Sequence, residues 1–247
     1  MKSKFYKVNG QTIRVVEMGE GEPLLMINGI TANVETWTPF AEKIKNRRLI
    51  MFDVPGIGLS PARRNPKKMH EIAIEMMALL TILGYDKVDI LGYSWGGTLA
   101  QQIVHQFPER IKKVILVSTT PGIKGKFPTF MTIGMMASFA SYVAATRVFN
   151  AERDYKELFI IPNPIGVVHQ VFALAHWSFN GRTFNDSHEV LIIGGKKDPL
   201  LPHGNSWRIK KNFKNADVYI APTGDHMWVL DSSETSSALV NNFLSGE

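Results

Sequence analysis

The chain of 247 residues contains no cysteine, which excludes disulfide bonds and any reaction carried by a thiolate. It also lacks the apolar stretch of a signal peptide near its start, so we expect a cytoplasmic protein. Its seven histidines form no H-x-x-x-H or H-x-E pair, and such pairs are a common sequence signal of a metal site. We therefore expect neither a metal ion nor another cofactor.

Acidic residues are fewer than basic ones, which gives a net charge of +6 and an isoelectric point near 9.4. No basic tract accompanies this excess, because the cations are scattered in pairs such as Arg47-Arg48 and Lys210-Lys211. Scattered charges are typical of solvated surfaces, so no nucleic-acid partner is expected. A cationic surface also suits contact with an anionic granule or membrane.

Apolar segments typical of strands alternate along the chain with segments typical of helices. The alternation predicts an α/β fold with a mostly parallel central sheet and helices on both faces. Before it, residues 5–8 and 12–16 flank an Asn9-Gly10 turn and predict a hairpin of edge strands. The remaining strands are expected at residues 24–27, 49–52, 88–91, 114–117, 190–193 and 218–220, and the helices near residues 40–45, 69–83, 98–106, 206–211 and 234–244.

Residues 92–96 have the pattern G-x-S-x-G, in which two glycines flank Ser94. An apolar strand precedes the pattern, and a segment of high helical propensity follows it. In this setting the pattern predicts a sharp strand-to-helix turn that exposes the serine hydroxyl at the edge of a sheet. A free hydroxyl is a weak nucleophile. It needs a base, an acid that orients this base, and donors for an oxyanion.

Two loops later in the chain supply a candidate acid and a candidate base. Asp198 and His226 each follow an expected strand. In enzymes with this serine turn the nucleophile, the acid and the histidine occur in that chain order. His226 is therefore predicted to accept the proton of Ser94, and Asp198 is predicted to orient the imidazole. Asp225 is the nearest alternative acid, but side chains of adjacent residues point apart.

The donors for an oxyanion are expected from two backbone N–H groups. One belongs to Trp95, the residue after the nucleophile, and the other belongs to the loop after the expected strand at residues 24–27. That loop begins Asn28-Gly29-Ile30. Ile30 is the predicted second donor, because Gly29 allows the backbone to turn inward.

The alternation of strands and helices stops between residues 121 and 187. Within this stretch residues 127–146 carry no charge and are long enough to span a bilayer. A proline, a glycine and several hydroxyl side chains argue against a transmembrane helix there. We expect residues 121–187 to form a helical lid over a core of residues 1–120 and 188–247. Apolar side chains of this lid are the predicted substrate contacts: Phe130, Met135, Phe139 and Trp177.

The chain resembles the α/β-hydrolase superfamily from about residue 5 onward. More narrowly, it resembles the intracellular medium-chain-length poly(3-hydroxyalkanoate) depolymerases. The matching segments are residues 28–37 (NGITANVETW), 52–60 (FDVPGIGLS), 91–101 (LGYSWGGTLAQ), 108–114 (PERIKKV) and 198–202 (DPLLP). The resemblance implies an α/β-hydrolase fold and cofactor-free hydrolysis of polyesters of 3-hydroxyacyl units, with Ser94, Asp198 and His226 as the catalytic triad. The lid is the least matched segment, and the lid selects the substrate.

The leading hypothesis is a serine-dependent hydrolase of a small-molecule ester or a polyester. A proline iminopeptidase-like aminopeptidase is an alternative, because that family also favours tryptophan after the nucleophile. In that case carboxylates of the lid, among Glu152, Asp154 and Glu157, would bind the ammonium group of the substrate. A third hypothesis is a hydrolase-fold receptor that binds a ligand without turnover. The complete triad argues against this receptor.

Overall fold

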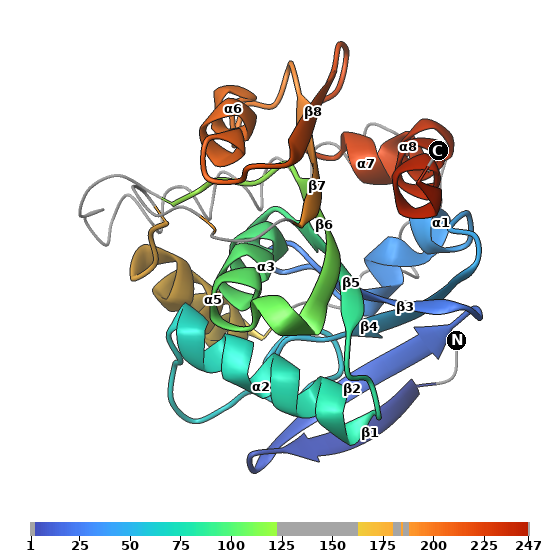
Figure 1. Ribbon diagram of the computed structural model, residues 1–247. Helices are drawn as coiled ribbons and strands as arrows, with labels where there is room; N and C mark the ends of the chain where they lie inside the picture. The colour runs from blue at the N-terminus through green and yellow to red at the C-terminus, as the bar shows by residue number, and fades with distance from the viewer. Residues whose placement is uncertain (1–2, 123–162, 180–183, 185–187, 247) are drawn as a thin grey trace.

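The computed structural model describes residues 3–122, 163–179, 184 and 188–246. At its centre is one sheet of eight strands in the spatial order β1-β2-β4-β3-β5-β6-β7-β8 (Figure 1). The strands from β3 to β8 run parallel, whereas β2 is antiparallel to both of its neighbours. The predicted α/β fold with a mostly parallel sheet is confirmed. The strands are β1 (Ser3–Val8), β2 (Gln11–Met18), β3 (Glu22–Ile27), β4 (Arg47–Phe52), β5 (Val88–Tyr93), β6 (Ile111–Val117), β7 (Glu189–Gly195) and β8 (Ala216–Ala221).

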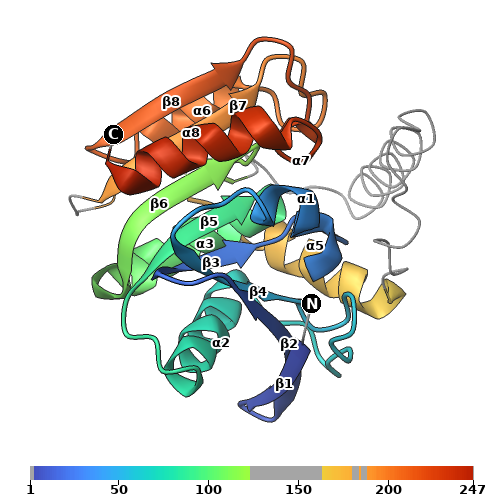
Figure 2. The ribbon, with the colours of Figure 1, turned by 90° about the vertical axis from the view of Figure 1, so that its right-hand side faces the viewer.

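Helices cover both faces of the sheet. Figure 1 shows α2, α3 and α5 on one side of the strands and α1, α7 and α8 on the other, and Figure 2 looks onto the second side. The described α-helices are α1 (Thr38–Ala41), α2 (Met69–Ile82), α3 (Trp95–Gln106), α5 (Pro164–Ala175), α6 (Gly204–Lys210), α7 (Trp228–Asp231) and α8 (Ser233–Ser245), and the described 3₁₀ segments are η1 (Val34–Trp37) and η2 (Pro108–Arg110).

Strand β3 shows how the sequence divides the core between the two faces. Leu25 and Ile27 belong to the apolar cluster that includes α2 and α3, whereas Leu24 and Met26 belong to the cluster that includes α1 and α8. Successive side chains of a strand point to opposite faces. A strand covered by helices on both faces is therefore apolar along its buried length, and residues 24–27 of β3 form an unbroken apolar run.

The topology brings the candidate site residues to one edge of the sheet. From β3 the chain passes to β4 on one side and later to β5 on the other, so the strand order reverses between β3 and β5. In open α/β sheets ligands bind outside the carboxyl ends of the strands at such a point. Ser94 directly follows β5, and Ile30 lies in the loop that follows β3. Asp198 and His226 lie in the loops that follow β7 and β8.

Two sequence-based expectations are wrong in detail. The hairpin forms, but β2 is not an edge strand, because it pairs with β4 as well as with β1. Its side chains Ile13, Val15 and Val16 are buried accordingly. The helix expected near residues 40–45 ends at Ala41. The chain already turns in η1 just upstream, and Pro39 favours the start of α1.

The predicted lid, residues 121–187, falls largely outside the described residues. Its described part contains α5 and the stretch that leads from it to Phe179. Carboxylates predicted for an aminopeptidase site, Glu152, Asp154 and Glu157, also lie outside the described residues.

Candidate active site

Ser94 occupies the turn between β5 and α3, and its backbone has a φ of +53°. This left-handed conformation is costly for a residue with a side chain and persists only where the surroundings impose it. The Ser94 N–H donates to the carbonyl oxygen of Val117 (2.9 Å), and the Thr119 hydroxyl donates to the carbonyl oxygen of Ser94 (2.7 Å). Gly96 is required at this turn, because a Cβ there would collide with the carbonyl oxygen of Ile27. The predicted strand-to-helix turn is present, with its serine in a strained conformation.

His226 links Ser94 to Asp198. Its Nε2 lies 2.9 Å from Ser94 Oγ, and its Nδ1 lies 2.8 Å from Asp198 Oδ2. The second carboxylate oxygen of Asp198 accepts the backbone N–H groups of Leu200 (2.9 Å) and Leu201 (2.8 Å). A carboxylate accepts hydrogen bonds, so Nδ1 is the ring nitrogen that carries the hydrogen. Nε2 is then left to accept the hydroxyl of Ser94. All three side chains are buried.

Two further residues define how this histidine is held. The Asp225 carboxylate accepts the backbone N–H of Met227 (2.9 Å). The hydroxyl of Tyr93 donates to the backbone carbonyl oxygen of His226 (3.0 Å), and the two rings lie 5.4 Å apart between centroids. Sequence reasoning did not single out Tyr93. The sequence feature that could have identified Tyr93 is its position directly before Ser94, at the carboxyl end of the buried strand β5.

The loop after β3 passes beside Ser94. A Cβ on Gly29 would lie 3.3 Å from Cβ of Ser94. Within the described part of the chain, no acceptor contacts the backbone N–H of Ile30 or that of Trp95. Backbone N–H groups without an acceptor are the kind of donor that can stabilise the negative oxygen formed when a carbonyl is attacked.

Asn28 supports this loop from within. Its side-chain amide donates to the carbonyl oxygen of Asn33 (2.8 Å), and its side-chain oxygen accepts the hydroxyl of Thr36 (3.3 Å). Asn28 is itself 3% exposed. An asparagine at this position therefore joins the start of the loop to the residues at its end through hydrogen bonds.

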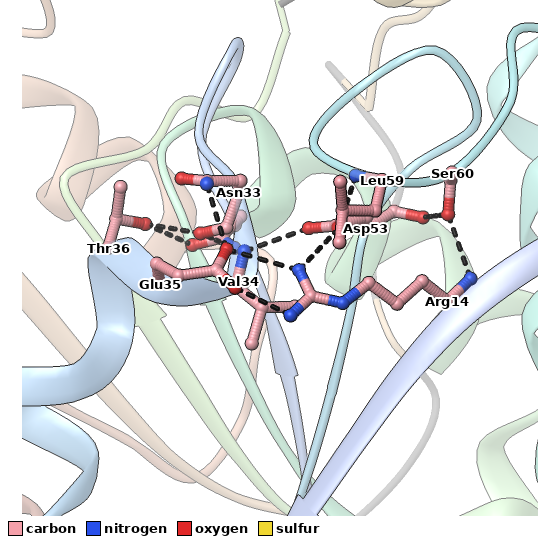
Figure 3. A network of polar contacts seen from close by, with 9 residues as sticks. Arg14, Asn33, Val34, Glu35, Thr36, Asp53, Leu59 and Ser60 are labelled. Atoms are coloured by element: carbon pink, nitrogen blue, oxygen red, sulfur yellow. Dashed lines mark hydrogen bonds and ion pairs between the residues drawn. The ribbon is translucent and has the colours of Figure 1, made fainter. Parts of the chain in front are cut away.

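A buried charge network fixes the far end of the same loop (Figure 3). The carboxylate of Asp53 accepts the backbone N–H groups of Val34 (2.8 Å) and Leu59 (2.9 Å) and the guanidinium of Arg14 (3.0 Å). The guanidinium of Arg14 also contacts Glu35. Burial raises the pKa of Asp53 above its ordinary value, and the hydrogen bonds from Leu59, Val34 and Arg14 oppose that rise. Sequence reasoning missed this network, because its members are distant in the chain.

Of the four predicted substrate contacts, only Trp177 belongs to the described residues. Phe130, Met135 and Phe139 lie outside the described residues. Trp177 is 6% exposed and packs in the core, and its indole N–H donates to the side chain of Gln102 (2.9 Å). Its role as a substrate contact remains a prediction.

Two features are absent from the described part of the chain. No helix there is both long and apolar enough to cross a membrane. No group of three or more histidine, aspartate or glutamate side chains there is arranged to hold a metal ion.

Comparison with known proteins gives matches along almost the whole chain. The family described as the alpha/beta hydrolase fold matches residues 22–148. The poly(3-hydroxyalkanoate) depolymerase of Ectopseudomonas oleovorans is 32% identical, in a match that covers 91% of this chain and 85% of that protein. The 2-hydroxy-6-oxo-2,4-heptadienoate hydrolase of Pseudomonas putida is 25% identical and covers 94% of this chain and 92% of its own.

A solved structure, that of an esterase from Exiguobacterium antarcticum, superposes with a TM-score of 0.85 at 19% identity. It covers 99% of this chain and 100% of its own. At an identity this low, the superposition shows a shared fold and nothing about activity. The family match, the depolymerase relative and the shared fold agree with one another. The chain belongs to the α/β-hydrolase family.

Proposed function

We propose that the protein is a serine hydrolase that cleaves carboxylic esters through an acyl-enzyme. The observation that carries this proposal is the pair of hydrogen bonds that joins Ser94 through His226 to Asp198, at 2.9 and 2.8 Å. A histidine held in this way can accept the serine proton and return it to a leaving group. The strained turn at Ser94 and the two N–H groups beside it add to the support.

The reaction follows from these positions. Ser94 Oγ attacks the ester carbonyl while Nε2 of His226 accepts its proton, and Asp198 stabilises the imidazolium that forms. The N–H groups of Ile30 and Trp95 hold the negative oxygen of the tetrahedral intermediate. The alcohol leaves with the proton from His226. A water molecule, activated by the same nitrogen, then releases the acid and restores Ser94.

For the substrate, we propose medium-chain 3-hydroxyacyl esters, including their polymers. The depolymerase relative, at 32% identity, supports this choice. The uncharged stretch at residues 127–146, placed in the proposed lid, also supports it, because an acyl chain needs apolar contacts. The net charge of +6 favours approach to an anionic granule surface.

The test is a series of p-nitrophenyl esters from acetate to dodecanoate, with a suspension of medium-chain polyhydroxyalkanoate in parallel. We expect hydrolysis that peaks at medium chain length, clears the polymer and disappears in Ser94→Ala. Activity confined to short esters would keep the serine mechanism and reject the substrate. Turnover of proline-β-naphthylamide without any ester hydrolysis would favour an aminopeptidase instead.

A further inference from the structure

Gln170, in the middle of α5, contacts both the loop after β3 and Trp95, the first residue of α3. Its side-chain oxygen accepts the backbone N–H of Thr31 (2.9 Å), and its backbone oxygen accepts the indole N–H of Trp95 (2.9 Å). Gln170 is 1% exposed. One buried residue of a helix in the proposed lid thus joins the loop after β3 to the residue after the nucleophile.

The contact with Thr31 bears on the geometry of Ile30. Thr31 has a φ of +66°, a left-handed conformation that is unusual for a β-branched residue and that requires support from its surroundings. The hydrogen bond to Gln170 orients the peptide group between Ile30 and Thr31. That peptide is joined directly to Ile30, so the hydrogen bond restrains the backbone of Ile30 from its C-terminal side.

Helix α5 is itself anchored to the loop after β4. The backbone N–H of Asn163 donates to the carbonyl oxygen of Gly56 (3.2 Å), and the Asn163 side chain accepts the N–H of Ile165 as a helix cap (2.9 Å). Gly166 packs so closely on Gly56 that a Cβ on Gly166 would collide with the backbone of Gly56. Gln170 therefore presents its acceptor from a fixed position.

Packing alone does not account for an amide at this position. Within the described part of the chain, the buried Nε2 of Gln170 has no hydrogen-bond partner. An unpartnered buried polar group costs roughly 1–3 kcal/mol. A leucine or methionine of similar volume would avoid this cost. It would lack only the side-chain oxygen that accepts the N–H of Thr31. The feature that an apolar residue cannot supply is the bond to Thr31.

We propose that Gln170 is a positioning residue that holds the oxyanion-binding N–H of Ile30 toward Ser94. The inference rests on the proposed serine mechanism. It assigns to α5 a part in transition-state stabilisation in addition to any contact with substrate.

The test compares Gln170→Leu with the wild type on a p-nitrophenyl ester of the best-hydrolysed length and on the matching thionoester. Sulfur is a weak hydrogen-bond acceptor, so the thionoester depends little on the oxyanion donors. We expect kcat on the ester to fall at least ~10-fold, with KM within ~2-fold, since loss of one such donor costs on the order of 10²–10³ in kcat. On the thionoester we expect a fall of less than ~3-fold. Rates are normalised to the number of sites titrated to completion with a fluorophosphonate.

Gln102→Leu is the matched control. Gln102, on α3, also accepts an N–H from the segment after α5, the indole N–H of Trp177, but it has no described contact with the loop after β3. We expect both of its rates to stay within ~3-fold of the wild type. Gln170→Met repeats the test with an unbranched side chain, should the leucine variant fail to fold.

Different results would overturn the role of Gln170 and the serine mechanism. Equal losses on ester and thionoester, or no loss on either, would overturn the role of Gln170 and leave the serine mechanism in place. Wild-type hydrolysis that persists in Ser94→Ala would overturn the proposed function and this inference together.

Discussion

Asp198 and Asp225 both lie near His226, but the carboxylate of Asp198 contacts the imidazole and that of Asp225 accepts the N–H of Met227. We predict that Asp198→Asn lowers kcat by about 10⁴-fold, because an amide can favour the wrong tautomer of His226. Asp225→Asn keeps the acceptor for Met227 and should change kcat by less than ~3-fold. Steady-state kinetics of both variants decide between the two acids. A larger loss in Asp225→Asn would contradict the assignment.

His169, next to Gln170 on α5, makes the stability of the fold depend on pH. Burial lowers the pKa of His169 below its ordinary value, and the positive charge of Arg63 lowers it further. In the unfolded chain His169 binds a proton at a pH of about 6.5, whereas in the folded chain it binds this proton only at a lower pH. The free energy of unfolding should therefore fall as the pH drops below about 6.5. Urea denaturation at pH 8 and pH 5 measures this fall, which should be smaller in His169→Gln. An equal fall in both proteins would contradict it.

The meeting of Ser94, Asp198 and His226 could be predicted from the sequence, whereas the contacts around them could not. Ser94, Asp198 and His226 each follow a strand, and parallel strands end at the same edge of a sheet. Tyr93 and Gln170 make hydrogen bonds to residues that only the folded chain brings near, since Gln170 contacts Thr31 across 139 positions. A sequence pattern records local spacing and carries no sign of such a contact.

At the scale of elements, the strands and long helices could be predicted because apolar spacing sets them. The place of β2 in the sheet could not, because it depends on which strand pairs with its second edge. Helix α5 lies within the proposed lid. The alternation of strands and helices stops there, so it does not predict where this helix begins and ends. Its docking depends on the contact of Gly166 with Gly56, which lies in a distant loop.

The network of Arg14 with Asp53 joins the loop after β3 to the loop after β4. Asp53 is fully buried, so Arg14→Met would leave a buried carboxylate with two N–H donors and no cation. We predict a loss of about 3 kcal/mol in the free energy of unfolding. Lys112→Met is the control, because its partner Glu22 is solvent-exposed and such pairs contribute under ~1 kcal/mol. Urea denaturation at pH 7 compares them, and similar losses would contradict a structural role for the network.

The close contact between α5 and the loop that contains Gly56 also contributes to the stability of the fold. In Gly166→Ala the added Cβ meets the backbone of Gly56, so we expect a loss of about 1–3 kcal/mol in stability. The value of kcat should fall as well, because α5 carries Gln170. Gly204→Ala is the matched control, since a Cβ there meets open space at the first position of α6. Thermal unfolding and ester kinetics test the pair. An unchanged Gly166→Ala would show that α5 does not dock as described.

At the scale of the whole molecule, the sheet is what assembles the site. Ser94 and His226 are 132 positions apart, yet the parallel strands β5 and β8 deliver them to hydrogen-bond distance. The fold class and this edge of the sheet followed from the alternation of strands and helices. The proposed substrate contacts Phe130, Met135 and Phe139 lie outside the described residues.

The most direct test of the central claim is to label the protein with a fluorophosphonate and locate the adduct by peptide mass spectrometry. We predict one adduct per chain, on Ser94, with none in Ser94→Ala and much slower labelling in His226→Ala. An adduct on another residue, or labelling that persists in Ser94→Ala, would contradict the claim that Ser94 is the nucleophile of this enzyme.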